Sequence, residues 1–133
     1  MHIYGFEKLQ VWQDAKRFTV YIYKLTDRYP SDEKFGMVSQ LRRASISIGS
    51  NIAEGSARKS PRDQAHFYHI SYSSLLEVLN LLIISSELGF IGEKDLLYCR
   101  QEIETISNKL NALRKAVLKN RLMPPSTTKQ FND

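Results

Sequence analysis

Apolar residues recur at steps of three and four along four segments of the chain, a spacing that keeps one face of an α-helix apolar. The first segment covers residues 9–29 and ends before Pro30, because proline disfavours helical geometry in the residue preceding it. The second segment takes Ser31 as its cap, buries Phe35 and runs toward Gly55, a residue suited to ending a helix.

The signals that mark the start of a helix are clearest at the third segment. Ser60 is a serine cap, Pro61 occupies the first helical position and Asp63 follows in the first turn. This segment stops at Gly89, and the fourth covers residues 93–121. Short links between long helices force neighbouring helices to run antiparallel. The sequence therefore predicts an all-α fold, an antiparallel up-and-down four-helix bundle.

Length and composition favour a single domain. The chain has 133 residues, of which 42% are hydrophobic and 25% charged, as in ordinary globular proteins. We expect the bundle domain to cover residues 1–122. The proline pair and polar run that follow cannot continue a helix, so residues 123–133 are predicted to form a flexible C-terminal tail.

A reducing environment suits the single cysteine, Cys99, which cannot form an internal disulfide and lies on the inward stripe of the fourth helix. No secretory leader opens the sequence. The longest apolar stretch, residues 75–88, is broken by polar side chains and is too short to cross a bilayer. We expect a cytoplasmic protein that does not enter membranes.

A stripe of polar side chains runs beside the apolar face of the second predicted helix, and a similar stripe follows the third. We predict that the two stripes face each other as a structural polar network, with Arg43 held by Glu54 or Glu77, since a buried arginine without a partner is too costly. The stripe on the second helix comprises Gln40, Arg43, Ser47, Asn51 and Glu54, and the stripe on the third comprises His66, His69, Ser73, Glu77 and Asn80.

The same side chains allow a second interpretation, a metal centre built from His66, His69, Glu54 and Glu77. Di-iron bundles need a Glu-x-x-His motif on each of two helices, and the sequence contains none. Phosphate-binding glycine loops, nucleophile elbows and Cys-x-x-Cys pairs are also missing. The sequence therefore indicates a protein that is not an enzyme and that binds no cofactor or metal.

Basic residues supply the remaining candidate for function, because the net charge of +5 favours polyanionic partners. A first cluster lies on or beside the link between the second and third helices, and a second loads the end of the fourth helix. We expect the two clusters at opposite ends of the bundle. The first comprises Arg42, Arg58, Lys59 and Arg62, and the second comprises Lys109, Arg114, Lys115, Lys119 and Arg121.

The run Gln-Leu-Arg-Arg-Ala-Ser-Ile-Ser-Ile at residues 40–48, followed by Asn-Ile-Ala-Glu-Gly at 51–55, resembles the signature of the four-helix bundle proteins encoded within intervening sequences of bacterial 23S ribosomal RNA genes. The resemblance covers roughly residues 4–118. Trp12 near the start and the Leu-Gly-Phe-Ile run at 88–91 support it. Ser71 and Ser73 stand where the family tends to have alanine and glycine.

The resemblance implies a ring-like homo-pentamer. It also implies kinship with the accessory variability determinant of diversity-generating retroelements, a basic pentameric barrel that binds nucleic acid and a reverse transcriptase. Together with the basic charge, it favours a non-enzymatic oligomeric adaptor that binds RNA or DNA through Arg42, Arg58, Lys59 and Arg62. The alternative is a protein-interaction scaffold without nucleic-acid binding, in which outward apolar side chains dock partners. Candidates for that role are Val11, Tyr23, Tyr68 and Leu118.

Overall fold

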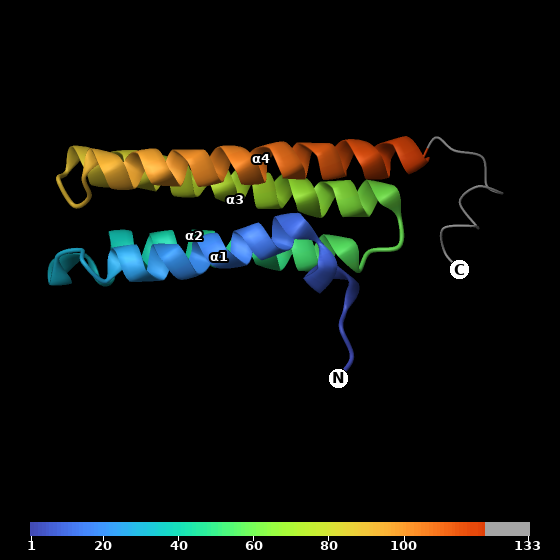
Figure 1. Ribbon diagram of the computed structural model, residues 1–133, viewed down its shortest axis with the longest axis horizontal. Helices are drawn as coiled ribbons and strands as arrows, with labels where there is room; N and C mark the ends of the chain where they lie inside the picture. Colours follow the sequence, from blue (N-terminus) through green and yellow to red (C-terminus); the bar gives the residue numbers. More distant parts are fainter. Residues whose placement is uncertain (122–133) are drawn as a thin grey trace.

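Four long helices make up the fold, which confirms the predicted all-α, up-and-down bundle (Figure 1). The computed structural model of the chain describes residues 1–121, and the predicted tail at 123–133 lies outside them. Two short 3-10 helices, η1 and η2, precede the first and second long helices. The elements are η1 (Gly5–Lys8), α1 (Gln10–Thr26), η2 (Ser31–Glu33), α2 (Met37–Ser56), α3 (Pro61–Glu87) and α4 (Glu93–Arg121).

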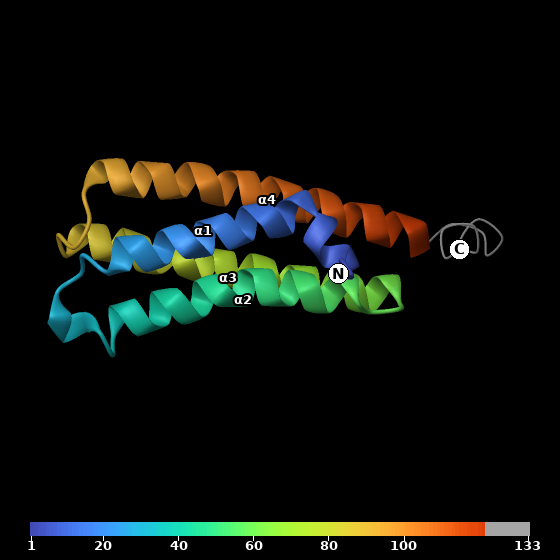
Figure 2. The same ribbon diagram turned by 60° about the horizontal axis from the view of Figure 1, so that its bottom comes forward.

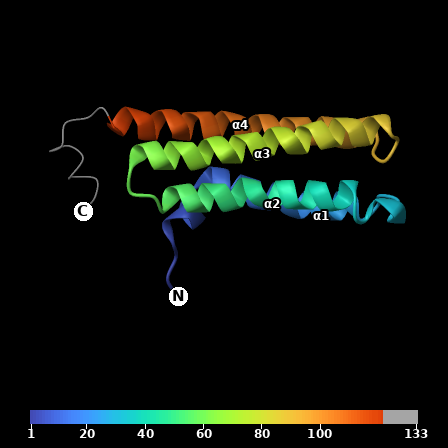
Figure 3. The same ribbon diagram turned by 180° about the vertical axis from the view of Figure 1, so that it is seen from behind.

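The helices lie side by side along one long axis, and each runs antiparallel to the next (Figures 1 and 2). Viewed from behind, α3 lies between α2 and α4 (Figure 3). The core consists of the apolar stripes predicted from the sequence, and its most deeply buried side chains come from all four helices. They include Phe18, Ile22, Leu41, Ile48, Leu75, Leu82, Ile106 and Leu110.

Two predicted helix boundaries are confirmed. The Ser60 hydroxyl accepts a hydrogen bond from the Asp63 backbone N–H at 3.0 Å, and Pro61 is the first residue of α3. Gly89 follows the end of α3 with a φ of +80°, a backbone conformation that glycine adopts without the steric cost of a side chain. The sharp turn into α4 depends on this residue.

The predicted start of the second helix is wrong. Residues from Ser31 form the 3-10 turn η2 and a loop, and α2 begins only at Met37. Phe35, which was expected to be buried, is 89% exposed, and Leu88 is 58% exposed. Each lies just outside a regular helix, where the period of three and four residues no longer decides which way a side chain points.

Small side chains let α2 and α3 approach closely. Gly55 does not end α2 as expected but is buried inside it, and a Cβ at this position would lie 2.7 Å from Cε1 of Tyr68. Ser71 is buried and donates a hydrogen bond to the Ile48 carbonyl oxygen at 2.7 Å. Close contact between these two helices therefore combines apolar packing with hydrogen bonds from buried hydroxyl groups.

A buried carboxylate joins α1 to α4. Asp14 is only 4% exposed, and its Oδ2 accepts a hydrogen bond from Nζ of Lys109 at 2.5 Å, while Gln10 and Arg17 reach Oδ1 from within α1. Burial alone would raise the pKa of Asp14, but the hydrogen bonds from Lys109 and Gln10 and the charges of Lys109 and Arg17 outweigh it. The pKa of Asp14 is lowered as a result.

Helix α3 is long and apolar enough, by length and composition, to be a candidate for crossing a membrane. It lies between α2 and α4 (Figure 3), and its buried side chains account for part of this composition, while Leu76 and Ile84 on it are exposed. Ser71 and Ser85 along it donate hydrogen bonds to backbone carbonyl oxygens inside the bundle. Its apolar face is that of a core helix.

Replacing Gly55 with alanine should destabilise the bundle. The new methyl group would meet the ring of Tyr68, which is 2% exposed and has no room to move. Overpacking should outweigh the gain in helix propensity and lower the free energy of unfolding by about 1–2 kcal/mol. Urea denaturation measures this change.

Gly49→Ala is the matched control for that experiment. A Cβ at Gly49 meets its nearest atom, Nε1 of Trp12, at 3.5 Å, which is ordinary contact. This variant should be neutral or stabilised by up to about 1 kcal/mol. Equal effects of the two substitutions would contradict the role assigned to Gly55.

Asp14→Asn should lower the free energy of unfolding by about 1–3 kcal/mol at neutral pH, because it removes a buried charge-assisted hydrogen bond. Since the pKa of Asp14 is lowered on folding, its contribution is present above the ordinary value of 3.8 and is lost as pH falls through the folded-state pKa. The difference in free energy of unfolding between the unsubstituted protein and Asp14→Asn should therefore become smaller below about pH 4.

Asp27→Asn provides the comparison, because the Asp27 side chain is 76% exposed in its ion pair with Arg42. Exposed pairs contribute about 0–1 kcal/mol, so this variant should stay within that range. Thermal denaturation across the pH series checks both variants. If Asp14→Asn lowers the free energy of unfolding by the same amount at pH 7 and at pH 3, the carboxylate does not act through its charge.

Candidate nucleic-acid interface

Apart from Arg42, the first basic cluster lies at the same end of the bundle as the end of α4, which corrects the expectation that the two clusters are opposed. In an up-and-down bundle α2 and α4 run in the same direction, so the link after α2 and the last turns of α4 meet at one end (Figures 1 and 3). We call this end, with its exposed cations, the basic end. It carries Arg58, Lys59 and Arg62 from the α2–α3 link and the start of α3, and Lys115 and Lys119 from α4.

Hydrogen bonds and stacking hold the α2–α3 link in a defined shape. The Arg58 backbone N–H donates to the Gly55 carbonyl oxygen at 3.1 Å, and the Arg58 carbonyl oxygen accepts from Nε2 of Gln64 at 3.0 Å. The Arg58 guanidinium lies 4.4 Å from the centre of the Phe67 ring and 3.3 Å from Glu54. Arg58 is therefore partly neutralised, and its position is fixed.

Lys59 and Arg62 are exposed like Arg58, but they make no ion pair within residues 1–121. Lys115 and Lys119 on α4 are exposed in the same way. Within the described chain, the acidic neighbours of these groups on the same turns are Glu54, which pairs with Arg58, and Asp63. The basic end thus presents an excess of positive charge to solvent.

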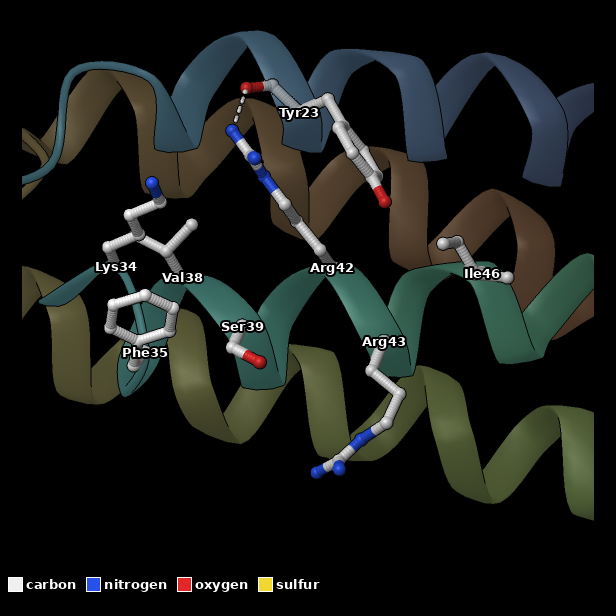
Figure 4. Close-up of a pocket in the computed structure, with 8 residues that line it drawn as sticks. All are labelled: Tyr23, Lys34, Phe35, Val38, Ser39, Arg42, Arg43 and Ile46. Atoms are coloured by element: carbon white, nitrogen blue, oxygen red, sulfur yellow. Dashed lines mark hydrogen bonds between the residues drawn. The ribbon is translucent and has the colours of Figure 1, made fainter.

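Arg42 does not lie with the other three predicted nucleic-acid-binding residues. It sits 16 positions before Arg58, nearer the opposite end of α2, and its guanidinium spans to α1 (Figure 4). There it donates to the Tyr23 carbonyl oxygen at 3.2 Å and to Asp27 at 2.9 Å, and it stacks 4.5 Å from the centre of the Tyr23 ring. Arg42 is a link between α1 and α2.

The predicted polar network contains one small cluster of direct contacts. The Ser47 hydroxyl lies 2.8 Å from the Ser74 hydroxyl on α3, and the Asn51 side-chain amide donates to both the carbonyl and the hydroxyl oxygen of Ser47. Gln40 and Arg43 are exposed. Among residues 1–121, no ion pair joins Arg43 to Glu54 or Glu77, and Glu54 instead pairs with Arg58.

The second polar stripe faces solvent. All of its members are exposed on α3, namely His66, His69, Ser73, Glu77 and Asn80. Over the described part of the chain, no three histidine, cysteine or acidic side chains come together as a metal site would need. Cys99 is buried, and burial, followed by the charges of Asp95 and Glu102, raises the pKa of its thiol to about 12. A thiol in this state is a poor nucleophile.

Apolar side chains proposed to dock partners fall into two groups. Val11 and Tyr68 were expected to face outward and are buried at 5% and 2% exposure, so that expectation is wrong. Both pack into the core, where the phase of their helices places them. Tyr23 is exposed and Leu118 is half-buried. Val20, Ile46 and Leu97 are also exposed and were not anticipated.

Comparison with known proteins agrees with this fold. One solved structure is described as a protein of unknown function from the S23 ribosomal protein family of Bacteroides thetaiotaomicron VPI-5482. It is 22% identical to this chain with a TM-score of 0.56, over 85% of this chain and 99% of that one, a likeness that concerns the fold alone. No functionally curated protein matches the chain.

The sequence pattern of one protein family covers most of the helices described above. It matches residues 7–112, a span that runs from η1 into the second half of α4 and includes the α2–α3 link. The chain therefore belongs to the family of 23S rRNA-intervening sequence proteins.

Proposed function

We propose that this chain is a non-enzymatic, oligomeric adaptor of the cytoplasm that binds nucleic acid, and RNA in particular, at the basic end. The observation that carries the proposal is the convergence of two basic clusters on one end of the bundle. Exposed lysine and arginine side chains neutralise phosphates and release counterions, which is the main source of affinity for nucleic acid.

The shape of the basic end supports this function. Phosphate contacts fix how a protein is oriented on nucleic acid, and the α2–α3 link that carries these cations has a defined shape because the Arg58 backbone is hydrogen-bonded to Gly55 and Gln64. Arg58 lies over Phe67 and next to Glu54, so Lys59 and Arg62 supply the stronger contacts. Arg42, which is paired with Asp27, has no part in it.

Assembly would multiply this charge. Family resemblance favours a cyclic homo-pentamer, and cyclic symmetry places the same end of every subunit on the same side of the ring. Weak phosphate contacts from each copy would then act together on one polymer, and their combined affinity would exceed that of a single end. The exposed side chains of Leu76 and Leu97 provide apolar surface for contacts between subunits.

Light scattering tests the assembly. A pentamer should have five times the 15.4 kDa mass of one chain, and its mass should hold across a range of concentrations. Because apolar contacts hold such assemblies together, moderate salt should leave the mass unchanged. A single-chain mass at every concentration would refute the oligomeric part of the proposal, but it would leave the basic end open to test.

Reversing charge at the basic end should abolish most nucleic-acid binding. Lys59→Glu combined with Lys115→Glu should weaken binding of a fluorescein-labelled RNA hairpin by about tenfold or more, because each lost contact changes the counterion term. Fluorescence anisotropy measures the affinity. Its logarithm should fall linearly with the logarithm of salt concentration in the unsubstituted protein, and less steeply in the variant.

Lys24→Glu combined with Lys94→Glu is the matched control, because it changes the net charge equally at the opposite end of the bundle. This protein should bind the hairpin within about twofold of the unsubstituted chain. Duplex DNA and single-stranded RNA measured alongside reveal the preferred polymer. Equal losses in both variants, or binding that ignores salt, would exclude the basic end as the site.

A further inference from the structure

A long hollow follows the outer side of α1 and α2, away from the core. It consists of two adjoining pockets that share Ile46, the first of about 440 Å³ around Tyr23 and Phe35 and the second of about 320 Å³ around Trp12 and Ala53. We call it the α1/α2 groove. From Val38 to Ala53 it follows α2 for about 22 Å, which is the length of about 15 residues of helix.

The floor and walls of the α1/α2 groove are apolar. Gly49 has no side chain to fill the floor, and Trp12 and Ala53 lie beside it. Along the walls, Val20 is 51% exposed and Ile46 47%. Aliphatic surface of this size facing solvent marks a contact site for another molecule.

One end of the α1/α2 groove is marked by Phe35, which is 89% exposed (Figure 4). Its loop is not loose, because the Met37 backbone N–H donates to the Glu33 side chain at 3.3 Å and the Gly36 N–H donates to the Glu33 carbonyl oxygen at 3.1 Å. A large aromatic ring held out on an ordered loop is the kind of anchor that dominates protein–protein binding.

Charge along the groove has one sign. None of the residues lining the two pockets is acidic, and the cations among them are Lys16, Lys34, Arg42 and Arg43. Arg42 is neutralised by Asp27, so Lys16, Lys34 and Arg43 supply the field. Lys16 and Lys34 lie 5.2 and 5.5 Å from the ring centres of Trp12 and Phe35, directly beside the apolar anchors.

We infer that the α1/α2 groove receives an amphipathic helix of a partner protein, with its apolar side on Val20 and Ile46 and acidic side chains along its flanks. Grooves of this length and polarity bind helices whose apolar residues recur every three or four positions. Glutamate or aspartate on the flanks would meet Lys16, Lys34 and Arg43, which gives the pairing its orientation and specificity.

Nucleic acid fits this groove less well than a helix does. Bases stack on aromatic faces, whereas the middle of the groove is formed by Val20, Ile46, Gly49 and Ala53. The cations that line the groove without an ion pair are only three, Lys16, Lys34 and Arg43. The inference concerns a surface separate from the basic end and stands whether or not that end binds RNA.

Selection from a defined peptide library tests the inference. The probe is a set of helical peptides of about 16 residues, long enough for the groove, with one face randomised among apolar residues and both flanks randomised among Glu, Gln and Lys. Selection against the full chain should enrich glutamate over lysine on the flanks. Peptides recovered this way should bind the chain measurably by fluorescence anisotropy.

Val20→Glu combined with Ile46→Glu should weaken binding of the selected peptides by about tenfold or more. The new carboxylates would make the groove polar and would repel the glutamates of the peptides. Ile84→Glu combined with Leu88→Glu is the control, since these side chains are 39% and 58% exposed and lie outside the groove. This control should leave binding within about twofold. Circular dichroism establishes that both variants remain helical.

Several results would overturn the inference. These are failure to enrich any peptide, equal enrichment of lysine and glutamate, or equal loss in the groove and control variants. A fall in oligomer mass, measured by light scattering, that Val20→Glu combined with Ile46→Glu causes and the control does not would assign the groove to a second copy of this chain. Displacement of bound peptide by labelled single-stranded RNA, unaffected by Lys59→Glu with Lys115→Glu, would assign it to nucleic acid.

Discussion

Close contact between α2 and α3 is the constraint that organises this bundle. Gly55 leaves space for the Tyr68 ring, and the hydroxyl groups of Ser71, Ser47 and Ser74 satisfy one another or a neighbouring carbonyl oxygen across the contact. Two helices that pack this tightly act as one rigid unit. The short link between them is held at a fixed place, and this determines where Arg58, Lys59 and Arg62 lie at the basic end.

Helix α1 is held to this unit in a different way. Against α2 it uses apolar packing together with Arg42, and against α4 it relies on the buried carboxylate of Asp14 and on Lys109. A buried charge is costly unless it is paired, so the position of α1 against α4 is fixed by the need of Asp14 for Lys109. Within residues 1–121, η1 contacts one end of α1 and α2, and the α1/α2 groove stays open along the rest of their outer side.

Much of the fold could be predicted because local signals agreed with the global one. The Ser60 cap, Pro61 and the left-handed Gly89 each act through their own backbone, and the helical period assigned most of the core. The exposure of Phe35 was not predicted because this residue lies in a loop, where the helical period does not apply. The contact between Asp14 and Lys109 was not predicted because the two residues are 95 positions apart, and a polar residue on an apolar face does not reveal its partner.

The candidate interface was only partly predictable. Residues 58–62 were identified by their composition, but Arg42 was grouped with them by sequence proximity, and only the fold shows that it reaches back to α1. The topology alone was sufficient to join the two basic clusters, since the second and fourth helices of such a bundle must point the same way.

The buried thiol of Cys99 has a practical consequence. With its pKa raised to about 12 and its side chain fully covered, it will not react appreciably with maleimide dyes while the chain is folded. A cysteine engineered on the surface would therefore be the only labelled position among the described residues. Pairs of such labels would allow distances between subunits, or to a bound polymer, to be followed by resonance energy transfer without first removing the native cysteine.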